Sequence, residues 1–171
     1  MDLKQVIRDI ADFPKPGILF RDITPVLEDP AAFAVALDGL DGLLAGLDYQ
    51  RLAAIESRGF LLGAPLADRH KKGLALVRKA GKLPRETVTE RYDLEYGSAE
   101  VEVHADALVP GQRVVVIDDL LATGGTAAAT GNLVRRCGAE VAAYVFLVEL
   151  EFLAGRERLA HAPVFSLVKY A

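Results

Sequence analysis

The sequence predicts an α/β fold in which a mostly parallel, twisted sheet is flanked by helices. Strand and helix patterns alternate from residue 51 onward, as they do when parallel strands are joined by crossover helices. RVVVID at 113–118 contains four successive apolar residues, three of them Val, which is typical of a strand buried on both faces. Ligands of such sheets bind beyond the carboxyl ends of the strands.

Two segments precede this alternation. Residues 2–12 suit an amphipathic helix, whereas the four prolines within residues 13–30 predict an irregular lobe. Asp29 and Pro30 suit the N-cap and first turn of a helix over about 31–46. The remaining strands are expected at 51–56, 73–79, 113–118, 140–150 and 165–170, the last at an edge, with helices over about 59–70 and 126–138.

One segment departs from the alternation and predicts a projecting ribbon. Residues 87–106 form two alternating arms around Tyr96-Gly97, which favours a two-stranded ribbon able to act as a mobile lid. Repeats, low-complexity tracts and linkers are absent from the sequence. We therefore expect one domain over residues 1–171, with a small N-terminal hood at about 1–30 and the mobile ribbon at about 80–104.

Composition limits the class of protein. Hydrophobic residues make up 51% and charged residues 26% of the chain, with a net charge of −4, which fits a soluble globular protein and argues against a nucleic-acid partner. No apolar run approaches the roughly 20 residues that cross a bilayer, so no membrane partner is expected. Cys137 is the only cysteine, which excludes an internal disulfide and favours a reducing cytoplasm.

Charge is unevenly spread along the chain. Residues 69–91 contain eight Lys or Arg and only two Glu. On an acidic protein, such a basic stretch suits either a local anion site or a solvated face, and composition by itself leaves both open.

The segment VVVIDDLLATGGT, residues 114–126, carries the most chemistry. A strand ending in two aspartates leads through a tight loop into a helix, whose first amides are unpaired and favour an anion. Glycines let a phosphate approach the main chain closely. The two carboxylates can accept vicinal hydroxyls, so the segment predicts a ribose 5-phosphate site. A helix cap or a magnesium site is the alternative for the acids, although no GxxxxGK[ST] loop occurs.

This segment resembles the signature of the type I phosphoribosyltransferases, and DDLLATGGT matches their adenine-specific branch. The resemblance covers essentially the whole chain, including the GRERL and FSLVKY segments near its end. It implies that the loop holds the 5-phosphate and that the acids hold the ribose hydroxyls. The residues so implied are Asp118, Asp119, Ala122, Thr123, Gly124, Gly125 and Thr126.

Two further segments follow predicted strands and suit a diphosphate. Ser57-Arg58 lies at a second strand-to-helix turn, and RKAGKLP supplies Arg78, Lys79 and Lys82. Cations and N–H donors are what a departing diphosphate needs, and the resemblance assigns both segments to it. A surface arginine at Arg58 and a solvated loop lysine at Lys82 remain alternatives. Mg²⁺ is implied by the diphosphate chemistry, with no protein metal site expected.

The stretch FPKPGILFRDITP, residues 13–25, resembles the adenine-binding hood of the family. The resemblance implies that the main chain of Leu19 and Arg21 reads the base edge, and that Phe20 and Leu150 cover its two faces. Core packing is the alternative for Phe20 and Leu150. The resemblance also names Glu95 as the acid/base that handles the N9 proton, with Tyr96 closing over the site; the residues themselves do not favour Glu95 over Glu100 or Glu102.

The implied activity is purine salvage. Adenine and 5-phosphoribosyl 1-diphosphate would give AMP and diphosphate in a cytoplasmic enzyme, and members of the family are usually homodimers. Two alternatives stay open. One is a phosphoribosyltransferase for a 6-oxopurine, against which the hood argues. The other is a non-catalytic nucleotide-sensing regulator on the same fold, which fold alone does not exclude.

Overall fold

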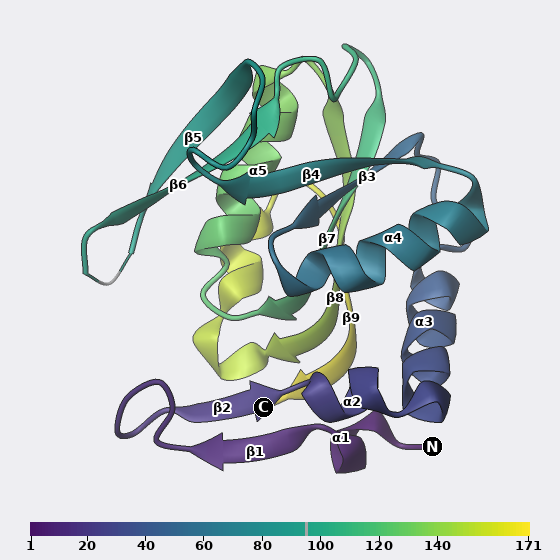
Figure 1. Cartoon of the computed structure of the whole chain (residues 1–171), viewed down its shortest axis with the longest axis vertical. Coiled ribbons are helices and arrows are strands. Elements are labelled where there is room, and N and C mark those ends of the chain that lie inside the picture. The colour runs from purple at the N-terminus through teal and green to yellow at the C-terminus, as the bar shows by residue number, and fades with distance from the viewer. Residues whose placement is uncertain (95) are drawn as a thin grey trace.

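The computed structural model describes residues 1–94 and 96–171. Within them, the main sheet has the strand order β5-β6-β4-β3-β7-β8-β9 (Figure 1). Its strands are β3 (Arg51–Ile55), β4 (Gly73–Lys79), β5 (Thr87–Asp93), β6 (Ser98–His104), β7 (Arg113–Leu121), β8 (Glu140–Leu150) and β9 (Val164–Tyr170). The helices are α1 (Leu3–Val6), α2 (Thr24–Glu28), α3 (Pro30–Leu44), α4 (Arg58–His70) and α5 (Gly125–Arg136), with short 3-10 helices η1 (Glu151–Leu153) and η2 (Gly155–Leu159).

The centre of the sheet is parallel. Strands β4, β3, β7, β8 and β9 all run in one direction, and β9 lies at the edge, as predicted. This confirms the predicted α/β class with a mostly parallel sheet. The antiparallel β5–β6 hairpin joins β4 through the pairs Arg78↔Glu102 and Lys79↔Val101, and Figure 1 shows its far end projecting from the sheet.

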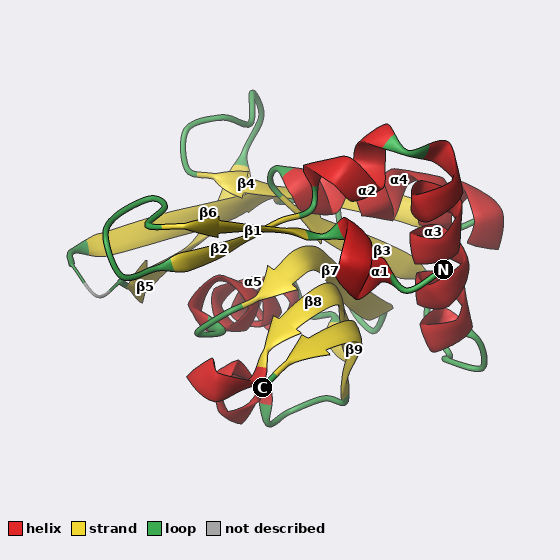
Figure 2. Cartoon of the chain, turned by 90° about the horizontal axis from the view of Figure 1, so that it is seen from below, coloured by secondary structure: helices red, strands yellow, loops and turns green. Residues whose placement is uncertain are grey.

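Helices cover both faces of the parallel strands (Figure 2). Helices α3 and α4 pack on one face, where Val115 and Ile117 of β7 belong to the apolar cluster. On the other face α5 packs over Val114 and Val116 of the same strand. The alternation shows why RVVVID reads as a continuous apolar run: both faces of β7 are buried.

Strand β7 is longer than its apolar run predicts. The expectation that it ends at Asp118 is wrong, because pairing with β8 continues through Leu120↔Val148 and Leu121↔Glu149. The two aspartates therefore lie within the strand, with side chains that alternate across it. Neighbouring strand β8 supplied the hydrogen-bond partners that extended the ladder, and this partner cannot be recognised from the local sequence.

The N-terminal prediction needs the largest correction. The helix expected over 2–12 ends at Val6, and β1 (Arg8–Ala11) then pairs antiparallel with β2 (Leu19–Asp22). Pairing with β2 satisfies the backbone of this segment better than one isolated short helix would. The irregular lobe expected over 13–30 is only partly irregular, because it contains β2 and α2. Figure 1 shows this hood beside the carboxyl ends of β8 and β9.

The prolines of the hood still mark boundaries. Pro25 is within the first turn of α2, and Pro30 is the first residue of α3, where a missing N–H costs nothing. The Asp29 carboxylate caps α3 by accepting hydrogen bonds from the amides of Ala31 at 2.8 Å and Ala32 at 3.2 Å, as predicted. None of the helices described for this chain is long and apolar enough to cross a membrane.

Candidate functional site

The carboxyl edge of the parallel sheet carries a cavity of about 450 Å³. Strands β3, β4 and β7 end or pass here, and the ribbon strand β5 closes one side. The cavity brings together most of the polar residues that the sequence analysis selected. It is lined by Glu56, Ser57, Arg58, Arg78, Lys79, Lys82, Tyr92, Asp118, Asp119 and Thr126, among others.

The two aspartates of β7 have different environments. Asp119 is buried and accepts a hydrogen bond from Arg58 Nε at 2.5 Å, so an ionised carboxylate is matched there by a guanidinium. Burial raises the pKa of Asp118 well above its ordinary value, and the neighbouring Asp119 charge adds to the rise. The pair therefore favours one neutral and one ionised carboxyl group, which together offer a donor and several acceptors.

The start of α4 lies directly against β7. A Cβ atom on Gly59 would lie 2.9 Å from Asp118 Oδ1 and 3.0 Å from the Ile117 carbonyl oxygen. Only glycine allows this approach. The peptide bond between Glu56 and Ser57, just before the helix, is cis. This turn places Arg58 over the aspartates of the next strand.

A contiguous loop, residues 122–126, follows β7 and lines a smaller cavity of about 90 Å³. It leads directly into α5, so the first amides of that helix face the cavity edge. Gly124 has a φ of 82°, and a Cβ there would lie 2.5 Å from the Gly155 carbonyl oxygen. A Cβ on Gly155 would lie 2.3 Å from the Ala122 carbonyl oxygen. The main chain of the loop thus packs directly on the main chain of η2, which supports the loop.

An ion pair fixes the supporting segment. Glu149, which is 2% exposed, accepts hydrogen bonds from Arg156 Nε and, at 2.7 Å, Nη2. Arg156 Nη1 also donates to the Val164 carbonyl oxygen at 2.7 Å. Burial by itself would raise the pKa of Glu149, but the hydrogen bonds and charge of Arg156 outweigh burial, and the pKa is lowered. Sequence reasoning missed Gly155 and this pair; the GRERL segment drew attention only through the resemblance.

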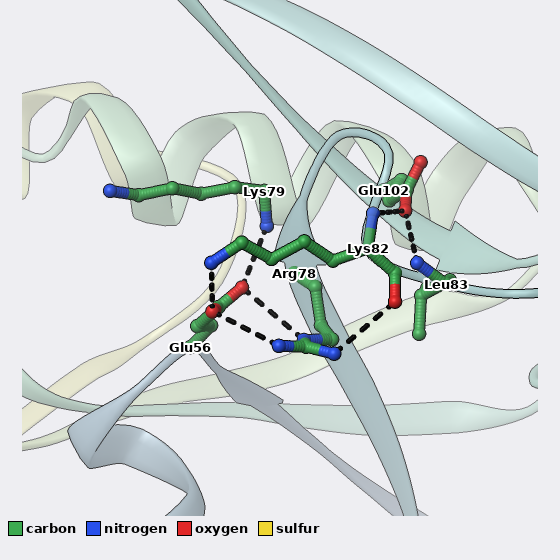
Figure 3. Close-up of polar contacts among 6 residues, drawn as sticks. All are labelled: Glu56, Arg78, Lys79, Lys82, Leu83 and Glu102. Atoms are coloured by element: carbon green, nitrogen blue, oxygen red, sulfur yellow. Dashed lines mark hydrogen bonds and ion pairs between the residues drawn. The ribbon is translucent and has the colours of Figure 1, made fainter.

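The basic loop after β4 is organised by Glu56, which sequence reasoning also missed (Figure 3). Its carboxylate accepts hydrogen bonds from Lys82 Nζ at 2.7 Å, from the Lys79 amide at 3.0 Å and from two Arg78 nitrogens at 3.3 Å each. These donors outweigh burial and lower the pKa of Glu56 to about 2. The position of Glu56 at the end of a predicted strand, directly before Ser57, was the available signal.

Glu102 of β6 anchors the same loop through the main chain. Its buried carboxylate accepts hydrogen bonds from the amides of Lys82 at 3.0 Å and Leu83 at 2.8 Å. The part of the basic stretch 69–91 that lines the cavity is therefore not a simple solvated face. Arg78 and Lys82 are ion-paired, and both line the cavity with Arg58.

The hood residues lie next to this cavity. The Arg58 guanidinium carbon is 5.9 Å from the centre of the Phe20 ring, which also meets Phe13 edge-on at 5.0 Å. Leu19 is exposed. The Arg21 side chain binds Asp9 and stacks over Tyr170 at 3.9 Å, and its main chain lies in β2, which pairs with β1.

Leu150 and the ribbon residues have separate surroundings. Leu150 is 8% exposed and belongs to the apolar cluster under α3 and α4, in line with the packing alternative. Tyr96 is 79% exposed, and Lys15 Nζ lies 5.4 Å from its ring centre. Glu95 lies outside the described residues. Tyr92, which the sequence did not single out, accepts a hydrogen bond from Thr126 Oγ1 at 3.1 Å.

Comparison with known proteins identifies the family. Residues 45–164 match the phosphoribosyl transferase domain family. The adenine phosphoribosyltransferase of a Synechococcus strain is 56% identical over 170 residues, which are 99% of each chain. A crystal structure of the enzyme from Thermoanaerobacter pseudethanolicus is 51% identical and superposes with a TM-score of 0.95, covering 98% of this chain and 97% of that one. The Saccharomyces cerevisiae enzyme, solved with adenine and an imino-altritol bisphosphate, is 41% identical with a TM-score of 0.91 over 96% of both chains. The chain therefore belongs to the adenine phosphoribosyltransferase family, as the loop after β7 and the paired aspartates before it indicated.

Proposed function

We propose that this protein transfers the 5-phosphoribosyl group from 5-phosphoribosyl 1-diphosphate to adenine, giving AMP and diphosphate in purine salvage. One observation carries the proposal: the paired aspartates of β7 line the basic cavity, and Asp118 also lines the small cavity formed by the main chain of residues 122–126. A sugar with a phosphate at one end and a diphosphate at the other matches this order of groups. The yeast relative, solved with adenine and a bisphosphate, supports the choice of base.

The donor is held along the edge of the sheet in this proposal. The 5-phosphate binds the main chain and hydroxyls of Ala122, Thr123, Gly124, Gly125 and Thr126, where helix α5 begins. Asp118 and Asp119 bind the two ribose hydroxyls. A neutral Asp118 can donate one hydrogen bond while ionised Asp119 accepts another, so the unequal pKa values of the pair suit two neighbouring hydroxyl groups.

The diphosphate lies on the opposite side of the aspartates. The Ser57 turn supplies main-chain donors, and Arg58, Arg78, Lys79 and Lys82 supply positive charge around the same cavity. As N9 of adenine forms its bond with C1 of the ribose, the bond from C1 to the diphosphate oxygen breaks and its electrons leave with the diphosphate. Cations fixed at that oxygen stabilise the charge that develops there.

Two ribbon residues complete the proposed chemistry. Glu95 takes the proton that leaves the adenine ring during attack, a step typically worth ~10²–10⁴ in rate. Tyr96, exposed at the ribbon tip, covers the site when the ribbon closes. Exclusion of water then protects the oxocarbenium-like transition state.

Magnesium enters with the substrate. Among residues 1–94 and 96–171 no group of three or more His, Cys, Asp or Glu is placed to hold a metal ion. The carboxylates that line the cavity are Asp118, which favours its neutral form, Asp119, which is bound to Arg58, and Glu56, which is bound to Arg78 and Lys82. These residues fit an ion whose ligands come mainly from diphosphate and water. Bound there, Mg²⁺ would neutralise charge on the leaving group.

The hood supplies base selectivity. The main chain of Leu19 and Arg21 reads the adenine edge, while Phe20 covers one face and Leu150 the other. The closeness of Arg58 to the Phe20 ring supports a base site beside the diphosphate turn. A homodimer in the cytoplasm, with no nucleic-acid or membrane partner, belongs to the same proposal.

A coupled assay of AMP formation tests the proposal. We expect the wild-type protein to use adenine, and to use hypoxanthine and xanthine far less. Glu95→Gln should lose most turnover while still binding AMP. Full turnover in that variant would refute the role of Glu95, preference for a 6-oxopurine would refute the assignment of the base, and tight donor binding without any turnover would favour a nucleotide-sensing regulator.

A further inference from the structure

Carboxylates of the protein pair with most of the cations of the basic cavity. Arg58 is paired with Asp119, and both Arg78 and Lys82 are paired with Glu56. Of the four cations that the proposed function assigns to diphosphate, Arg58, Arg78 and Lys82 are therefore already bound to carboxylates of the protein. A bound diphosphate has to take some of these donors from their present partners.

We propose that Glu56 competes with the diphosphate group for Lys82 and Arg78, and so limits how tightly the protein holds diphosphate. The inference rests on the proposed function, because that function makes diphosphate the ligand of the cavity. It assigns Glu56 a positioning role: this carboxylate holds the Lys82 and Arg78 side chains before the donor binds and takes them back when diphosphate leaves.

The geometry of Glu56 resembles that of a bound anion (Figure 3). One carboxylate oxygen, Oε1, accepts from Lys82 Nζ at 2.7 Å and Arg78 Nη2 at 3.3 Å. The other, Oε2, accepts from the Lys79 amide at 3.0 Å and Arg78 Nε at 3.3 Å. Ammonium, guanidinium and amide donors are the groups that phosphate oxygens also bind. The Glu56 side chain is 11% exposed, whereas Arg78 is 32% and Lys82 47% exposed, so water screens the carboxylate less than the cations that it binds.

The charge of Glu56 distinguishes competition with diphosphate from simple support of the loop. Glu56 and diphosphate are both anions that line or enter one cavity, and like charges in a poorly screened site repel. The low pKa of Glu56, about 2, keeps this carboxylate ionised throughout the neutral range. Loop support by itself does not need Glu56, because Glu102 holds the same loop by the amides of Lys82 and Leu83.

Calorimetric titration of magnesium diphosphate into the full-length protein tests the inference. Glu56→Gln keeps the size of the side chain and removes its charge. We expect this variant to bind diphosphate at least roughly 10-fold more tightly, the size of one lost interaction with a charged group. The KM for the donor should fall with it, and the KM for adenine should not change. Unchanged or weaker diphosphate binding would overturn the competition.

Two matched variants separate competition from general effects. Glu102→Gln removes a nearby negative charge that holds the loop through its main-chain amides, and we expect this variant to bind diphosphate no more tightly than wild type. Equal tightening in that variant would mean that loop charge in general, rather than Glu56, is responsible. In a Lys82→Met background the gain from Glu56→Gln should shrink, because the contested cation is gone.

Folding, diphosphate binding and enzymatic activity are measured separately. A thermal melt checks each variant, and if Glu56→Gln does not fold, Glu56→Asp replaces it. Asp keeps the charge but withdraws it from Lys82 by one methylene group, so we expect a smaller tightening; wild-type or weaker affinity would again refute the inference. Diphosphate binding is measured without adenine, so a failure of the proposed function would be seen only in the AMP assay.

Discussion

The two proposed anion sites beside the paired aspartates differ in how they are built. Residues 122–126 are one continuous piece of main chain that runs from the end of β7 into the first turn of α5 and packs against the main chain of Gly155. The basic cavity on the other side is assembled from side chains at the ends of β3 and β4, tied together by ion pairs with Glu56. In the proposed function, the phosphate that stays on the sugar therefore binds a fixed cradle. The diphosphate that must leave binds charged side chains that can change partners.

The largest effect is expected where the fixed cradle is most tightly packed. Gly155→Ala would place a methyl group 2.3 Å from the Ala122 carbonyl oxygen, so the loop has to move. Displacement of about 1 Å at a positioning site can cost on the order of 10² in rate, and we expect kcat/KM for the donor to fall by about that factor. Steady-state kinetics with varied donor measures it.

Gly42→Ala is the matched control for this change. Gly42 lies in helix α3, and a Cβ there would meet nothing within 4 Å. This substitution should leave kcat/KM unchanged and stabilise the helix by up to ~1 kcal/mol. If Gly155→Ala instead shows wild-type kinetics, η2 does not set the position of the loop. The loop could then no longer be contrasted, as a fixed cradle, with the basic cavity.

The second prediction concerns the buried Asp119 carboxylate of the basic cavity. Asp119→Asn leaves Arg58 without its ionised partner at 2.5 Å and removes a charged acceptor for a ribose hydroxyl. An interaction with a charged group is worth about 1.5–3 kcal/mol, so we expect kcat/KM for the donor to fall by roughly 10- to 100-fold. Asp38→Asn, which breaks the exposed pair with Arg69, should change kcat/KM little. Similar losses in the two variants would contradict a specific role for Asp119.

The third prediction uses the raised pKa of Asp118. Because the pKa is higher in the folded protein than the ordinary 3.8, the folded state binds the proton more tightly. Stability is therefore greatest at acidic pH with respect to this group, and it is lost as the pH rises through the folded pKa. Asp118→Asn should raise the melting temperature of the ligand-free protein at pH 8, by roughly 2–4 °C per kcal/mol gained. The advantage should shrink toward pH 4.

Donor binding sharpens this third test. If Asp118 binds a ribose hydroxyl and lowers the stability of the ligand-free protein, the more stable Asp118→Asn variant should bind the donor less tightly than wild type. Melting curves from pH 4 to 8, with and without donor, measure both properties. A variant that is less stable than wild type at pH 8 would show that burial of Asp118 is not a cost.

The smallest effect is expected at the contact between ribbon and loop. Tyr92→Phe removes the hydroxyl that accepts a hydrogen bond from Thr126 Oγ1 at 3.1 Å. A neutral hydrogen bond contributes about 0.5–1.5 kcal/mol, so the KM for the donor should change by less than about 10-fold. Asn132 also holds the ribbon, through Glu90 at 2.9 Å. A change of 100-fold or more would mean that Tyr92 acts in the reaction itself.

Local sequence was sufficient to predict one of the two proposed anion sites. Residues 118–126 are contiguous, and their glycines, aspartates and helix start predict a cradle without any distant partner. The apolar run in β7 likewise predicted a strand buried on both faces, which the two clusters around Val114–Ile117 confirm. The N-terminal helix failed because β1 pairs with β2, and pairing between separated segments leaves no local periodicity to recognise.

The sequence by itself determined the α/β class, the order of most strands and helices, and the family, because these depend on periodicity and on contiguous motifs. Only the tertiary structure decided that Glu56 holds Lys82 and Arg78, that Gly155 closes behind Gly124, and that Asp118 and Asp119 differ in their environments. The physical reason is that pairing, close approach and burial depend on which distant segments meet. Charge and steric contact act through space, and adjacency along the chain does not specify them.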